Sequence, residues 1–216
     1  MEGIVDLAQR YEAAAPTWEG KIARLGYPTA YAHLIEAAPV SGRVLDIGCG
    51  SGALAAAALA RHGPRIAALT LADPSAGMLA DAARRFAAAP VPVRTVRAGI
   101  GAPAFAPGAA DTILCAHVIE HLDDPAAALR WLAGRLAPGG RLVLAVSRPH
   151  WCTALLRWVW GHRAYRPDAV LAMLAAAGLT GARPVPFPAG PPSRTSCGYL
   201  AQRARPTARP VAPACA

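Results

Sequence analysis

The chain has 216 residues and a formal net charge of +9, enough length for one domain with a full core but too little for two comfortable ones. Its arginines are scattered and no basic run is interleaved with aromatic residues, so the charge indicates solubility rather than nucleic-acid binding. No stretch approaches the length of a membrane-spanning helix, residues 1–10 do not resemble a signal peptide, and the five cysteines lack C-x-x-C spacing. These features predict a reduced, cytoplasmic protein.

The N-terminal segment, residues 1–40, is predicted to form a helical cap. Residues 4–38 are amphipathic with helical spacing, and the pattern is interrupted at Pro16 and around Gly26-Tyr27-Pro28. Two or three short helices are therefore expected before the first strand.

A predicted strand over 43–47 leads into a glycine-rich turn, VLDIGCGSG at 44–52, and then into an alanine-rich helix over 53–62. Glycines at alternate positions, Gly48, Gly50 and Gly52, let backbone approach a bound ligand closely, and a helix N-terminus favours an anionic group of that ligand. The spacing differs from the dinucleotide pattern G-x-G-x-x-G. Asp46, two residues before the first glycine, is awkward for a pyrophosphate but suits an ammonium group.

A second buried strand, predicted over 65–72, ends at Asp73-Pro74. A carboxylate at that strand end can accept hydrogen bonds from both ribose hydroxyls of a nucleoside, in a dehydrogenase as well as in other nucleotide-binding proteins. A helix over 75–89, capped by Ser75 or Asp73, and a third strand over 93–98 are expected to follow.

The fourth strand, predicted over 111–117, opens the segment CAHVIEHLDDP at 115–125. His117 is expected at its carboxyl end, near the reversal of strand order where ligands bind in open α/β sheets. His117 and His121 flank Glu120, but a metal pair needs a sustained helix and a third ligand, whereas Asp123-Asp124-Pro125 begins a new helix. We therefore predict no metal site and interpret Glu120 and His121 as structural.

The remaining predicted elements are a helix over 125–136, a fifth strand over 141–147, a helix over 167–177 and two strands over 182–187 and 197–203. Residues 148–166 carry three tryptophans among arginines, which fits a lid-like insertion over the site or, alternatively, contact with a membrane interface. The Pro/Ala/Arg-rich tail, 205–216, is predicted to be disordered.

The turn at 44–52, Asp73, the segment 115–125 and the turn LAPGGRLV at 136–143 together resemble class I S-adenosylmethionine-dependent methyltransferases, in the branch that includes quinone and small-molecule enzymes. The resemblance covers about residues 43–144. It implies an α/β fold over residues 1–204: a single Rossmann-like, doubly wound, mainly parallel sheet of seven strands with a last antiparallel strand, beside the N-terminal helical cap.

The resemblance also implies S-adenosylmethionine as the cofactor. Asp46 would hold its amino group and Asp73 its ribose, while Tyr11 and Trp18 lie where such enzymes often place aromatic contacts. Relatives usually carry an acid near Ile100 that binds the adenine amino group, and this chain has none, so backbone at 99–101 would replace it. The implied cofactor-binding set is Tyr11, Asp46, Gly48, Cys49, Gly50, Gly52, Asp73, Pro74, Met78, Gly99, Ile100, Ala116 and His117; Met78 equally suits the core.

The implied reaction is transfer of the activated methyl group to an oxygen, nitrogen or carbon nucleophile of a small molecule. For a hydroxyl acceptor His117 is the first candidate general base and His150 the second. Three alternatives remain: a quinone or phospholipid methyltransferase at a membrane surface, an NAD(P)-dependent oxidoreductase, and a non-catalytic protein that binds S-adenosylmethionine.

Overall fold

The computed structural model describes residues 18–151 and 163–205. Seven strands form one sheet in the order β3-β2-β1-β4-β5-β7-β6, in which β7 is antiparallel to both neighbours and the other described pairs are parallel. The predicted fold class is thereby confirmed. The strands are β1 (Gly42–Ile47), β2 (Ile66–Ala72), β3 (Val93–Val96), β4 (Ala110–Ala116), β5 (Leu136–Ser147), β6 (Leu179–Val185) and β7 (Ser196–Arg203).

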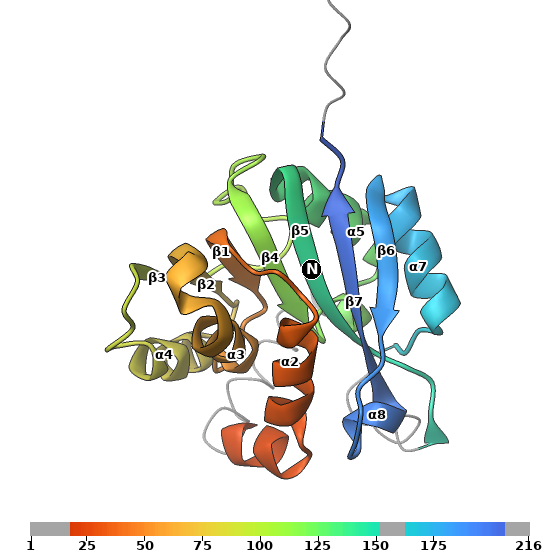
Figure 1. Ribbon diagram of the computed structural model, residues 1–216, viewed down its shortest axis with the longest axis horizontal. Helices are drawn as coiled ribbons and strands as arrows, with labels where there is room; N and C mark the ends of the chain where they lie inside the picture. The colour runs from red at the N-terminus through yellow and green to blue at the C-terminus, as the bar shows by residue number, and fades with distance from the viewer. Residues whose placement is uncertain (1–17, 152–162, 206–216) are drawn as a thin grey trace, which may run out of the picture.

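Helices cover both faces of the sheet (Figure 1). One face packs against α2 (Tyr27–Glu36), α3 (Ala53–His62) and α4 (Ala76–Arg85), and the other against α5 (Pro125–Arg135) and α7 (Pro167–Ala176). Strands therefore bury alternate side chains on opposite sides: in β5, Val143 faces the first layer and Leu144 the second. Burial on both faces explains why β5 contains an unbroken apolar run over residues 142–146. The short elements are η1 (Gly63–Arg65), η2 (Ile119–His121) and α8 (Pro192–Thr195).

The strand order reverses between β1 and β4. From β1 the chain continues outward to β2 and β3, whereas from β4 it continues in the opposite direction to β5. The loops that leave the carboxyl ends of β1 and β4 therefore diverge, which is the place where open α/β sheets bind ligands.

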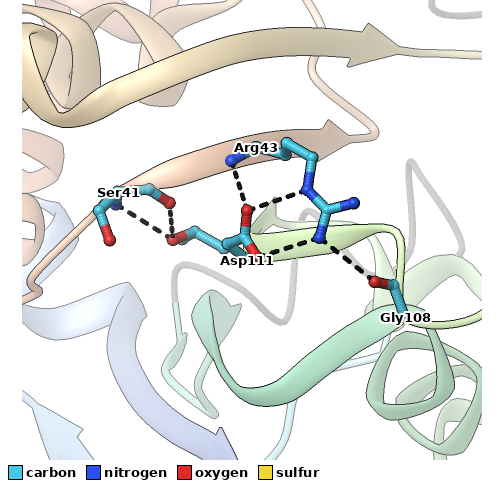
Figure 2. Close-up of polar contacts among 5 residues, drawn as sticks. Ser41, Arg43, Gly108 and Asp111 are labelled. Carbon is cyan, nitrogen blue, oxygen red and sulfur yellow. Dashed lines mark hydrogen bonds and ion pairs between the residues drawn. The ribbon is translucent and has the colours of Figure 1, made fainter.

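The opposite ends of these two strands are joined by polar contacts (Figure 2). Asp111 Oδ2 accepts hydrogen bonds from the Arg43 backbone at 2.8 Å and from its Nε at 3.0 Å, and Oδ1 accepts one from Nη2 at 3.1 Å. Thr112 Oγ1 donates to the Ser41 carbonyl at 3.0 Å. The first residues of β1 are thus fixed to β4 far from the ligand-binding end.

Several predicted boundaries were wrong. Strand β5 begins at Leu136 instead of 141, because Leu136 already pairs with Ala110 before the register shifts. Helix α4 ends at Arg85 instead of 89, since Phe86 leaves the helical conformation. Strand β6 occupies Leu179–Val185 instead of 182–187, directly after Gly178 with its φ of 77°, and α8 was not predicted.

Some predictions concern residues outside the described ranges: Tyr11 and the rest of the cap before Trp18, the greater part of the insertion 148–166, and nearly all of the tail 205–216. Within the part of the chain that the structure describes, no helix has the length and apolar character needed to cross a bilayer.

Candidate functional site

The glycine-rich turn after β1 has left-handed backbone at each of its three glycines, with φ values of 70° at Gly48, 52° at Gly50 and 80° at Gly52. The backbone N–H groups of Gly48 and Cys49 both donate to the Ala72 carbonyl, at 2.8 and 3.0 Å. The turn is thereby attached to the end of β2. At the three glycine positions, any residue with a Cβ atom would have a strained backbone.

At two of the three glycines, neighbouring side chains of the protein occupy the space that a Cβ atom would need. A Cβ atom on Gly48 would lie 2.2 Å from Val118, and one on Gly52 would lie 2.6 Å from the Phe86 ring. At Gly50 the nearest group is the indole nitrogen of Trp18, at 3.7 Å. Of the three positions that were expected to admit a ligand, Gly50 is therefore the one with space around it.

Asp46 lies beneath this turn, near the end of β1, and its residue surface is 1% exposed. Burial raises the pKa of its carboxyl to about 7, and the charge of Asp73 adds to the rise, while a hydrogen bond from the Ala55 backbone opposes it. The carboxylate oxygen Oδ2 has no hydrogen-bond partner among the described residues. A buried, unpaired carboxylate oxygen is costly, so a cationic or hydrogen-bond-donating ligand group would fit here.

Asp73 joins the loops that follow β1 and β2. Its Oδ2 accepts from the Gly50 N–H at 2.9 Å, and its Oδ1 accepts from the Ser75 N–H, also at 2.9 Å. Ser75 in turn caps α4, because its Oγ accepts from the Met78 N–H at 3.2 Å. The prediction that Ser75 or Asp73 caps this helix is thereby confirmed with Ser75 as the capping side chain.

His117 directly follows β4 and is the one non-glycine residue with positive φ, 57°, in the described ranges. Its Nδ1 lies 3.1 Å from Glu120 Oε1 and 3.3 Å from Ser147 Oγ, and its buried Nε2 has no described partner. Burial alone would raise the pKa of Glu120, but the hydrogen bond and charge of His117 and the Ser147 N–H outweigh it and lower that pKa. This arrangement of a base with an orienting acid suits proton transfer.

A tyrosine that sequence reasoning did not single out lies against this pair. The rings of Tyr27 and His117 meet edge to face, with centroids 5.1 Å apart and an interplanar angle of 84°. The Tyr27 hydroxyl is 3.0 Å from Ser196 Oγ at the start of β7. Burial raises the pKa of Tyr27, which keeps the phenol neutral. The sequence Gly26-Tyr27-Pro28 was interpreted only as an interruption of the helical pattern, because the contacts of Tyr27 with His117 and Ser196 depend on tertiary structure.

The methyltransferase domain family model matches residues 18–181 of this chain. The chain belongs to the methyltransferase domain family. It is 41% identical over 127 residues to an uncharacterized protein of Synechococcus, covering 57% of this chain and 30% of that protein. It is 38% identical over 103 residues to the ubiquinone biosynthesis O-methyltransferase of Xanthomonas euvesicatoria, covering 48% and 42%. The chain thus spans less than half the length of these curated relatives.

Solved methyltransferases have the same fold. A chain of the complex between a Haloferax volcanii methyltransferase activator and a methyltransferase superposes with a TM-score of 0.74 at 17% identity, covering 90% of this chain and 98% of that one. The N-methyltransferase NodS of Bradyrhizobium japonicum, in complex with S-adenosylhomocysteine, superposes with a TM-score of 0.63 at 23% identity, covering 82% and 85%. The fold is that of class I S-adenosylmethionine-dependent methyltransferases.

The remaining predicted site residues of this methyltransferase domain lie at or after the ends of several elements. Met78 is buried, with 1% of its surface exposed, which suits the core alternative; Pro74 is exposed and its carbonyl accepts from Arg97 Nε at 3.1 Å. Gly99 and Ile100 lie in the loop after β3, and Ala116 ends β4. His150 lies beside Trp151, with ring centroids 5.6 Å apart and an interplanar angle of 34°. The roles assigned to these residues stay predictions.

The glycine turn also meets the N-terminal helical residues 18–24. Arg85 of α4 donates from Nε to the Ser51 carbonyl at 2.8 Å and forms an ion pair with Glu19. Together with the contact of Trp18 at Gly50, this attaches the segment that precedes α2 to the candidate cofactor site.

Proposed function

We propose that this domain transfers the methyl group of S-adenosylmethionine to a nucleophile of a small molecule. The observation that carries the proposal is Asp46: a buried carboxylate with an unpartnered oxygen, beneath a glycine turn at the point where the strand order reverses. The amino group of the cofactor's methionine tail has the charge and the hydrogen-bond donors that this oxygen lacks. Bound there, the cofactor would supply a methyl group already activated by its sulfonium.

The chain's own residues would then bind and align. Asp46 would accept from the ammonium group, and Asp73, which lies at the end of β2 and contacts the glycine turn at Gly50, would accept from the ribose. Gly50 would border the methionine tail, and Trp18 would close over it. Alignment of acceptor and methyl carbon contributes up to about 7–11 kcal/mol to such reactions.

The acceptor class is part of the proposal. His117, with its orienting carboxylate, favours an acceptor that loses a proton, and the relatives named for ubiquinone biosynthesis act on oxygen. A membrane-bound quinone or phospholipid is the second candidate, favoured by Trp151, which is 80% exposed at the border of the insertion 148–166.

The proposed compartment of the protein is the reducing cytoplasm. Three described cysteines are free, which supports this: Cys49, Cys115 and Cys197.

Calorimetric titration with S-adenosylmethionine and S-adenosylhomocysteine tests the proposal, with NADH as a control ligand. We expect both adenosyl ligands to bind, and the affinity to rise about fivefold from pH 6 to pH 7, because the ammonium group binds the ionised form of Asp46. In Asp46→Asn this pH dependence should vanish and binding should weaken by about tenfold or more. Binding of NADH alone, or undiminished binding in the variant, would rule the assignment out.

A further inference from the structure

His117 is held from three sides. Glu120 of η2 and Ser147 at the end of β5 contact its Nδ1, and Tyr27 at the start of α2 packs its ring edge to face against the imidazole. Among the described contacts, these leave Nε2 as the ring nitrogen without a partner. The imidazole side chain retains 22% of its accessible surface.

The backbone of His117 is also constrained. Its φ of 57° is unfavourable for a residue with a Cβ and costs about 1–3 kcal/mol, so surrounding contacts must impose it. One of them is the hydrogen bond from the His117 N–H to the Ala145 carbonyl, 2.9 Å long. Strain of this kind is tolerated where it aims a side chain.

Glu120 is fixed more firmly than its partner. It is 1% exposed, its Oε1 accepts from the Ser147 N–H at 2.6 Å, and its own carbonyl accepts from the Arg163 N–H at 2.9 Å. An apolar side chain would fill this buried place at lower cost than a carboxylate. Among the described residues, the side chain that contacts this carboxylate is that of His117, through Nδ1.

We propose that Glu120 is a positioning residue for His117: it keeps the proton of the neutral imidazole on Nδ1 and leaves Nε2 to accept a proton from a hydroxyl of the methyl acceptor. This inference rests on the proposed function and narrows its acceptor to a hydroxyl compound. The acceptor oxygen gives its proton to Nε2 and forms the new bond to the methyl carbon, while the carbon–sulfur pair remains on sulfur. The imidazolium then returns the proton to water.

Glu120 is the charged group with a described contact to His117; Ser147 is neutral, and Tyr27, whose hydroxyl contacts Ser196, stays neutral because burial raises its pKa. Replacing the carboxylate by an amide should therefore change the titration of His117 directly.

Nitrogen-15 NMR of the histidine rings tests this, with His117 assigned through His117→Gln. In the wild type we expect the neutral ring to be protonated on Nδ1. In Glu120→Gln, which keeps an acceptor oxygen for the Ser147 N–H, we expect the proton affinity of His117 to fall by about tenfold or more. Asp111→Asn is the matched control, an acid-to-amide change at the opposite end of β4 (Figure 2), and should leave the titration unchanged.

Two results would overturn the inference: a neutral wild-type ring protonated on Nε2, or a His117 titration that is the same in Glu120→Gln. The first needs only the wild-type protein, so the inference stays testable if the variant fails to fold. Calorimetry with S-adenosylmethionine on the same samples separates the two proposals. If the wild type does not bind S-adenosylmethionine, the proposed function is contradicted. The tautomer and the titration of His117 test only the role of Glu120.

Discussion

The burial of Asp46 has opposite effects on the stability of the ligand-free fold and on the proposed binding of a cationic ligand. Its burial raises the pKa of the carboxyl from 3.8 to about 7, so the folded protein holds a proton that the unfolded chain releases. Stability due to this group is therefore full below pH 4, falls as pH rises from about 4 to about 7, and stays low above that. The side chain that we propose as the partner of a cationic ligand thus weakens the ligand-free fold at neutral pH.

Asp46→Asn is expected to stabilise the ligand-free protein at pH 8, by as much as about 4 kcal/mol, and to change its stability little at pH 3, where the wild-type carboxyl is protonated in both the folded and the unfolded state. The amide oxygen can still accept from the Ala55 N–H. Urea unfolding at both pH values measures the difference. A variant less stable than the wild type at pH 8 would contradict the pKa and its cause.

The sequence alone could single out those residues of the candidate site that lie at the end of a predicted strand. Asp46 was singled out because it lies two residues before Gly48, and Asp73 and His117 because each lies at the carboxyl end of a predicted strand, where ligands bind in open α/β sheets. Glu120 was interpreted as structural, and Ser147 and Tyr27 were not singled out, because their contacts with His117 depend on how η2, β5 and α2 meet. The spacing of these residues along the chain does not predict that they contact His117.

At the scale of elements, the glycine turn shows that one sequence pattern can satisfy two requirements. Its motif indicated a ligand, yet Gly48 and Gly52 are also needed for the positive φ values and for contact with Val118 and Phe86. Element boundaries were less predictable for a related reason. Pairing with a neighbour extended β5 back to Leu136, across the Pro-Gly-Gly sequence that was expected to precede the strand.

Gly52→Ala is expected to cost about 2–4 kcal/mol of stability, the sum of a left-handed backbone and a clash with the Phe86 ring. Gly134→Ala in α5 is the matched control: its Cβ would meet nothing within 4 Å, and helical glycine to alanine should stabilise by about 0.5–1 kcal/mol. Thermal unfolding of both variants measures the contrast. Equal effects would mean that the turn relaxes around the added methyl group.

At the scale of the whole molecule, the continuity of the sheet depends on β7. This strand lies between β5 and β6 and pairs antiparallel with both, so β6 has β7 as its one strand partner in the described sheet. We expect a chain stopped after residue 190 to lose the cooperative unfolding transition and to form aggregates, because edges of β5 and β6 remain unpaired. Denaturation monitored by circular dichroism, together with size-exclusion chromatography, measures this; a monomer with a sharp transition would contradict it.

The order of the strands in space also sets an order in time. Neighbours β1, β2, β3 and β4 are all present once residue 116 has been made, so this half of the sheet can pair while the ribosome is still extending the chain. The other half must wait, because β5 and β6 are synthesised before the strand that separates them. His117, whose partner Tyr27 bonds to Ser196 of β7, therefore reaches its final surroundings only at the last step of assembly. A nascent chain would hold a formed cofactor turn before it holds a finished acceptor site.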